Sequence, residues 1–196
     1  MSFVALANAD FPIRRLSVNE YESLARSGIL DEDDQLELLE GWIVQKMTKN
    51  PLHDGTVDEI TRHLSALLPN GWYVRTQNVL TTPDSAPEPD LVVVRGVPRD
   101  YLRRHPTAAD VALVVEVADS SVERDRLKCR IYAHAGVSTY WLVNLVDNQI
   151  EVYSDLAETG RNAVYTSELV YESDKTILFC VPNREAIEIL VSDLLP

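Results

Sequence analysis

The sequence predicts an α/β fold in which helices flank a mixed central sheet on both faces. Helical and strand-like segments follow one another in the order helix, strands, helix, two strands, helix and strands, and such an order builds layered domains. Residues 111–117 are apolar at almost every position, as in a central strand that is covered on both sides. The length of 196 residues suits one domain, 1–196, with a sizeable core.

The N-terminal part predicts one helix and a short strand. Ser17 and Glu20 have the S-x-x-E spacing of a capping box, and Gly28 supplies the helix stop. Residues 35–47 follow as a short amphipathic segment, a turn at Gly41 and a strand.

A second helix is predicted over residues 53–68. Its apolar residues recur at helical spacing and form one face: Val57, Ile60, Leu64, Leu67 and Leu68. A strand over residues 72–80 comes next. Pro87 and Pro89 then disfavour regular pairing, so the following strand is expected to begin at Asp90.

The C-terminal half predicts a third helix and several strands. Ser120 and Glu123 have the spacing of another capping box, and Gly136 ends the helix. Residues 139–153 predict two strands joined by a tight turn. The last apolar segment, residues 185–195, fits helix and strand equally well.

The composition favours a cytoplasmic protein without a membrane segment. Residues 1–11 lack the basic and long apolar parts of a secretory signal, and no apolar run is long enough to span a bilayer. Cys129 and Cys180 form no Cys-x-x-Cys pair, so neither a disulfide framework nor structural zinc is expected.

The net charge of −13 means that any face that binds nucleic acid must be local, because phosphate contacts need basic residues. Two basic clusters could supply such a face, although both could equally be solvated charged segments. The first comprises Arg99, Arg103, Arg104 and His105, and the second comprises Arg124, Arg126, Lys128 and Arg130.

Glu116 interrupts the apolar run of residues 111–117. A buried carboxylate is costly unless it is neutralised, paired or bound to metal. Taken alone, it could be a strand-end glutamate that reaches solvent. Asp90 changes this interpretation, because the connection between the two strands lets them lie side by side. Two adjacent carboxylates repel each other unless a cation lies between them, and Mg²⁺ would resolve the conflict, with the Val117 carbonyl as a third ligand.

These motifs resemble the PD-(D/E)XK nuclease superfamily, and more closely its Uma-two-type family of restriction endonucleases. The resemblance spans the chain from about Leu16 to the C-terminus in seven ordered blocks: LSVNEYESL, LELLEGWIV, the helix opening at His53, PEPDLVVV, LVVEVADSS, DRLKCRIYAHAGVSTYWLVN and QIEVY. It implies a restriction-endonuclease-like fold and Mg²⁺-dependent cleavage of DNA, with Mn²⁺ as a substitute and a homodimer as the assembly.

By this resemblance Asp90 and Glu116 are metal ligands, and Glu37 matches a glutamate of the family's N-terminal helix. His53 matches a family histidine at the start of the second helix. The lysine of the superfamily name is replaced by Ala118, and the family's lysine corresponds to Lys128 in the following helix.

Each of these assignments has a structural alternative. Lys128 shares a helical face with Ile131, Tyr132 and Ala135 and should point toward the sheet, yet it could be a surface lysine with a buried stem. Glu37 could be a surface residue, with Glu40 an equal candidate. His53 could be a hydrogen-bonded core residue, and Tyr140 and Trp141 are expected to be core aromatics.

Three functions follow from these observations. The first is an endonuclease that hydrolyses phosphodiester bonds in DNA. The second is a nuclease-fold binding module without turnover, which the acidic composition favours. The third is a metal-dependent hydrolase of a non-nucleic phosphate ester, which does not need a basic surface.

Overall fold

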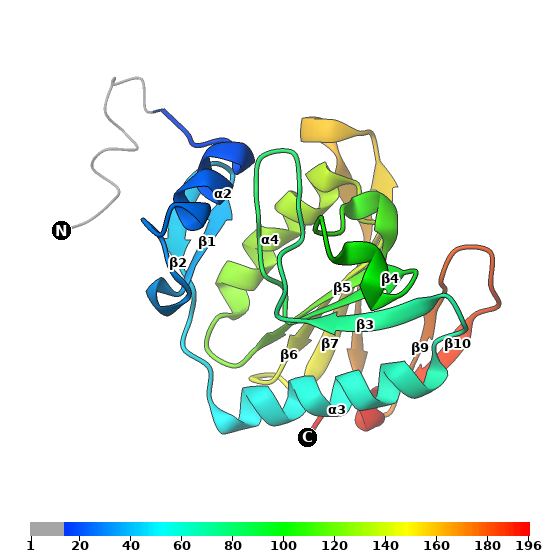
Figure 1. Cartoon of the computed structure of the whole chain (residues 1–196). Helices are drawn as coiled ribbons and strands as arrows, with labels where there is room; N and C mark the ends of the chain where they lie inside the picture. The colour runs from blue at the N-terminus through cyan, green and yellow to red at the C-terminus, as the bar shows by residue number, and fades with distance from the viewer. Residues whose placement is uncertain (1–13) are drawn as a thin grey trace.

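The structure, a computed structural model, describes residues 14–196 and is built on a six-stranded mixed sheet (Figure 1). Neighbouring strands run antiparallel, except that β5 and β6 run parallel. The strands in spatial order are β3 (Trp72–Thr76), β4 (Leu91–Arg95), β5 (Val111–Ala118), β6 (Tyr140–Asn144), β7 (Gln149–Ala157) and β8 (Val164–Glu172). The predicted α/β class with a mixed sheet is confirmed.

Two helices cover opposite faces of this sheet. Helix α3 (Pro51–Leu67) packs on β3 and β5, and α4 (Val122–Ala135) packs on β5, β6 and β8 (Figure 1). Because α4 connects the parallel pair β5 and β6, it acts as their crossover. All eight residues of β5 are buried, as predicted for a central strand. Across residues 14–196, the helices are all too short or too polar to traverse a lipid bilayer.

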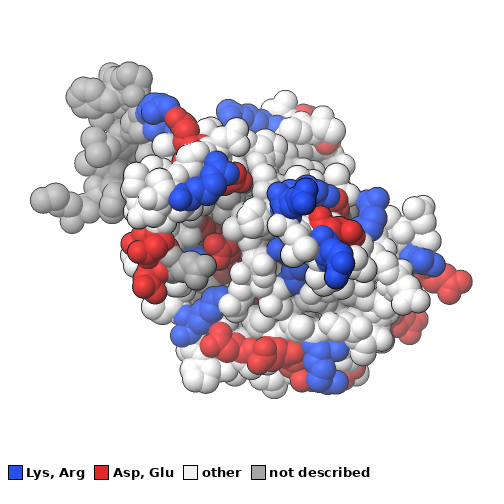
Figure 2. All heavy atoms as spheres, in the orientation of Figure 1, with Lys and Arg blue, Asp and Glu red and all other residues white. Residues whose placement is uncertain are grey.

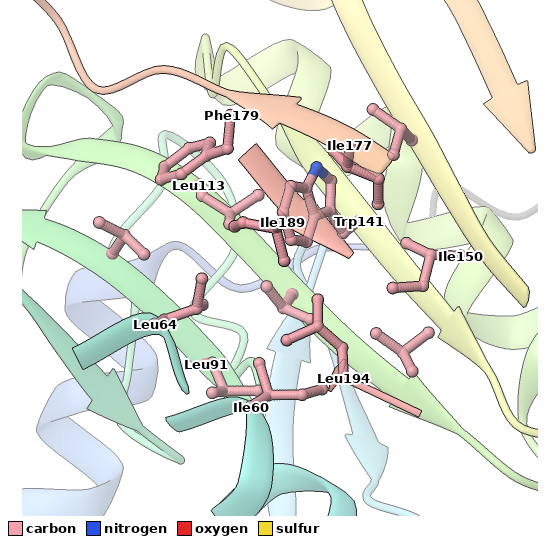
Figure 3. Packing of buried hydrophobic residues seen from close by; sticks show 14 of the residues in the cluster. Ile60, Leu64, Leu91, Leu113, Trp141, Ile150, Ile177, Phe179, Ile189 and Leu194 are labelled. Atoms are coloured by element: carbon pink, nitrogen blue, oxygen red, sulfur yellow. The ribbon is translucent and has the colours of Figure 1, made fainter. Parts of the chain in front are cut away.

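The larger core lies between the sheet and α3 and includes a C-terminal hairpin (Figure 3). The hairpin consists of β9 (Thr176–Phe179) and β10 (Ile187–Leu190). The apolar segment 185–195 is therefore mainly a strand, followed by a short 3-10 turn. Val57, Ile60 and Leu64 of α3 are buried as predicted, whereas Leu67 is 39% exposed. Tyr140 and Trp141 are core residues.

The N-terminal elements form a small unit beside the sheet, with α2 (Val18–Arg26) packed near a hairpin of β1 (Leu36–Leu39) and β2 (Trp42–Gln45). The predicted capping box at Ser17 is present. Glu37 lies in β1, so its assignment to a helix is wrong. Glu40 and Gly41 both have positive φ, at 49° and 81°, which is the backbone of a tight hairpin turn.

Four predicted boundaries need correction. The N-cap of α4 is Ser121 rather than Ser120, and the predicted capping box is absent from this helix: the Ser121 hydroxyl donates to the carboxylate of Asp125 instead of capping the backbone, and Glu123 pairs with Arg126. Helix α3 begins at Pro51, before His53, with Asn50 as its cap. The strand expected over residues 72–80 ends at Thr76, and β4 begins at Leu91, directly after Asp90.

Candidate active site

Asp90 and Glu116 lie next to each other where β4 and β5 meet. Leu91 pairs with Val115 in this antiparallel register, which places the preceding residue, Asp90, opposite Glu116. The backbone N–H of Val117 donates to Oδ2 of Asp90 at 2.9 Å. Both carboxylate residues are nearly fully buried, at 5% and 3% exposure. The structure thus brings together the two acids that the sequence singled out.

Glu116 is held by two donors from α4. The hydroxyl of Tyr132 donates to Oε1 at 2.6 Å, and the ammonium of Lys128 donates to the same oxygen at 2.9 Å. Burial is the main cause that raises the pKa of Glu116 to about 8; the attraction of Lys128 opposes the rise, and the neighbouring carboxylates add to it. A carboxyl group with this pKa exchanges its proton close to neutral pH.

Three carboxylates surround the ammonium group of Lys128. Besides Glu116, its ammonium lies 3.4 Å from Asp125 and 3.7 Å from Glu37. Its side chain is 8% exposed, because it shares the inward helical face with Tyr132, as the spacing predicted. Burial opposes its charge, but the three carboxylates outweigh burial and raise the pKa of Lys128. Lys128 therefore remains a fixed cation.

Glu37 reaches this cluster from the N-terminal hairpin and is 2% exposed. Arg124 of α4 donates to Oε1 of Glu37 at 3.3 Å and to the backbone carbonyl of Gln45 at 2.6 Å. These contacts fasten the hairpin to α4. Glu40, the alternative candidate, pairs instead with Arg130 outside this cluster.

His53 and Lys49 both contact Asp90. Nε2 of His53 lies 3.2 Å from Oδ2 of Asp90, and Nδ1 lies 3.2 Å from Oδ1 of Asp54. Burial lowers the pKa of His53, but its bonds to Asp90 and Asp54 outweigh burial and raise it. The ammonium of Lys49 lies 3.3 Å from Oδ1 of Asp90. His53 is therefore a largely buried histidine that contacts Asp90, one of the two candidate metal ligands.

Sequence reasoning missed three residues of this site: Lys49, Asp125 and Tyr132 as a donor to Glu116. Asp125 and Tyr132 lie three residues before and four residues after Lys128, so helical spacing could have added both. Lys49 belongs to no helix or strand. Periodicity therefore offered no signal for it.

A cleft with a volume of about 1450 Å³ opens above these residues. It is lined by every site residue that the sequence predicted: Asp90, Glu116, Val117, Lys128, Glu37 and His53. Tyr101, Arg103, Arg104 and His105 form part of its wall. The buried acids therefore lie in the lining of an open cleft.

The oxygen donors on the cleft floor fit a hard divalent ion. Both bonds to Glu116 use Oε1, so Oε2 could bind an ion. The N–H of Val117 faces Asp90, and a strand residue turns its N–H and C=O to the same side. Within residues 14–196, no three His, Cys, Asp or Glu side chains are arranged to hold one ion. Mg²⁺ needs only one or two protein carboxylates, because it retains water ligands.

The two basic clusters differ in their contacts. All four basic residues of the second cluster pair with carboxylates, so their charges are offset within the described chain. In the first cluster Arg104 pairs with Asp110, while Arg103 is exposed and makes no ion pair within the described chain. In Figure 2, basic side chains gather where the segment between β4 and β5 lies in Figure 1.

Comparisons with known proteins agree with this architecture. Residues 18–178 match the model of a family, Uma2, described as "Putative restriction endonuclease". The fold is similar to the crystal structure of a "putative nuclease belonging to DUF820" from Anabaena variabilis ATCC 29413, with a TM-score of 0.70. The identity is 18%, and the alignment covers 91% of this chain and 97% of that chain. No curated protein matches the sequence.

Proposed function

Because the chain belongs to the Uma2 family, described as "Putative restriction endonuclease", we propose that it is a metal-dependent endonuclease that hydrolyses phosphodiester bonds of DNA. One observation carries this proposal: Asp90, Glu116 and Lys128 converge on the floor of a cleft large enough for a nucleic-acid strand. Adjacent carboxylates with a nearby ammonium are the elements that phosphodiester hydrolysis with a divalent ion requires.

Asp90, Glu116 and the Val117 carbonyl would hold the ion, Mg²⁺ or Mn²⁺ as its substitute. When bound, such an ion supplies Lewis-acid chemistry that activates water and offsets charge on the phosphate. His53 fixes the orientation of Asp90 through Oδ2, and Tyr132 fixes Glu116 through Oε1. Both acids are therefore held in place before the substrate arrives.

Lys128 provides a permanent positive charge beside Glu116. Because an ammonium group offers donors only, it cannot itself be a metal ligand. Its role is to position the attacking water or offset negative charge at the reacting phosphate. Glu37 helps to hold this ammonium in place from the opposite side.

Plasmid cleavage tests the proposal. The native protein should nick or linearise plasmid DNA with Mg²⁺ or Mn²⁺, and chelation should stop the reaction. Asp90→Asn keeps a hydrogen-bonding side chain beside His53 and Val117 but loses the charge that holds the ion, so it should be inactive. If the folded native protein binds DNA without cutting it, the chain is a binding module. If it hydrolyses only small phosphate esters, DNA is not its substrate.

Arg103 should contribute a phosphate contact on the cleft wall. Arg103→Ala should weaken DNA binding and reduce the slope of log affinity against log salt by about one unit. Arg99 is the matched control, because it lies in the same exposed segment but does not line the cleft. Fluorescence anisotropy over a salt series measures both variants. Equal slopes for Arg103→Ala and the native protein would remove Arg103 from the DNA-binding face.

A further inference from the structure

We propose that Lys49 binds the phosphate of the substrate, and that a divalent ion releases it from Asp90 to do so. This inference rests on the proposed function and extends it. The Lys49 ammonium lies 3.3 Å from Oδ1 of Asp90 and offsets its charge. Lys49 thus occupies the side of Asp90 where an arriving cation would bind.

The other cations that line the cleft floor are more tightly held in place by their partners. Lys128 is enclosed by three carboxylates and is 8% exposed. Arg124 is held by both Glu37 and the Gln45 carbonyl. Lys49 is 35% exposed, and within residues 14–196 its single ion pair is the one with Asp90. Among these three cations it is the one that is both exposed and held at a single point.

The position of Lys49 on the chain allows it to move. It lies in the segment between β2 and α3, which is neither helix nor strand and runs along the side of the molecule in Figure 1. The lysine side chain is flexible and carries a compact charge. Because this segment borders the cleft, an ammonium that leaves Asp90 remains next to the substrate.

Electrostatic repulsion would release the Lys49 ammonium from Asp90. A divalent ion on Asp90 repels the adjacent ammonium and satisfies the carboxylate in its place. The phosphodiester then becomes the nearest negative group for Lys49. Metal and Lys49 therefore compete for Asp90 when no substrate is present, and cooperate once substrate is bound.

The test compares Lys49→Met with Lys46→Met. Lys46 is the matched control, because it lines the same cleft three residues away but pairs with Glu88 at 2.8 Å. Mn²⁺ affinity is measured by titration calorimetry without DNA. Removal of one charge a few ångströms from the ion should tighten Mn²⁺ binding on the order of tenfold in Lys49→Met, and should change it little in Lys46→Met.

The second measurement is the affinity for labelled DNA in Ca²⁺, with the DNA shown to be intact by electrophoresis. Lys49→Met should bind DNA more weakly and lose about one unit of salt slope, while Lys49→Arg should retain most of the affinity. Unchanged Mn²⁺ affinity in Lys49→Met would overturn the competition, and unchanged DNA affinity would overturn the phosphate contact. Asp90→Asn distinguishes failure of the Lys49 inference from failure of the metal site. If the native protein binds Mn²⁺ no better than Asp90→Asn does, the proposed function itself is contradicted.

Discussion

Lys128→Met should abolish DNA cleavage and lower the free energy of unfolding of the metal-free protein by about 3–5 kcal/mol. The loss of activity follows from the missing charge beside Glu116. The loss of stability follows because Glu116, Asp125 and Glu37 would share a buried region without the ammonium that lies within 4.0 Å of each. An uncompensated buried charge is among the largest single-residue costs in a folded protein.

The same substitution should increase the stabilisation by metal. Because lysine is not a metal ligand, its loss alone would leave the Mn²⁺-induced rise in melting temperature unchanged. The carboxylate cluster changes this expectation, because Mn²⁺ in Lys128→Met would also relieve repulsion that the lysine no longer offsets. The melting temperature should therefore rise more with Mn²⁺ in the variant than in the native protein.

Arg130→Met is the control for the Lys128 experiment. Arg130 lies on the same helix, but its side chain is 60% exposed and pairs with Glu40, so both activity and stability should change little. Lys128→Arg should restore little cleavage, because a planar guanidinium does not fit the space that the three carboxylates leave for a compact ammonium group. Cleavage by Lys128→Met at the native rate would show that another residue supplies the positive charge.

The positions of the two acids, Asp90 and Glu116, could be predicted because short sequence patterns indicate them. A charged residue inside an apolar strand marked Glu116, and the proline before Asp90 marked the start of the neighbouring strand. The spacing of Lys128 relative to Tyr132 indicated an inward-facing lysine, which the structure has. These inferences need only the periodicity of a strand or a helix.

The remaining features depend on contacts between distant segments. The short turn at Glu40 and Gly41 makes a hairpin of a segment whose amphipathic pattern also fits a helix. The contact of Lys49 with Asp90 spans the second helix and the third strand of the chain. Pattern within a short window contains no information on such a pairing.

Glu116→Gln should stabilise the metal-free protein at alkaline pH while it removes metal binding and cleavage. Burial raises the pKa of Glu116 from the ordinary 4.5 to about 8, so the folded state holds a proton that the unfolded state has lost between these values. Stability due to Glu116 is therefore complete below pH 4.5 and falls by about 1.4 kcal/mol per pH unit until pH reaches the folded pKa. Glutamine carries no charge and lacks this loss.

Urea denaturation of both proteins over this pH range measures the effect. Other groups, including His53 with its raised pKa, also contribute to the pH dependence of stability, so the difference between the two proteins is used to isolate Glu116. Glu151→Gln is a control for which the opposite change in the free energy of unfolding is expected. Burial raises the pKa of Glu151, but Arg126, Tyr153 and Asn144 outweigh burial and lower it to about 2, so this substitution should destabilise the fold at neutral pH.

If the free energy of unfolding changed with pH in the same way for the native protein and for Glu116→Gln, the raised pKa of Glu116 would be contradicted. The expected divergence has a functional meaning, because metal binding requires the deprotonated carboxylate. The affinity for Mn²⁺ should then rise with pH until pH reaches about 8, the folded pKa of Glu116. Glu116 thus lowers the stability of the metal-free fold at the pH where it becomes competent to bind an ion. A buried carboxylate that costs stability in this way is consistent with the proposed metal site.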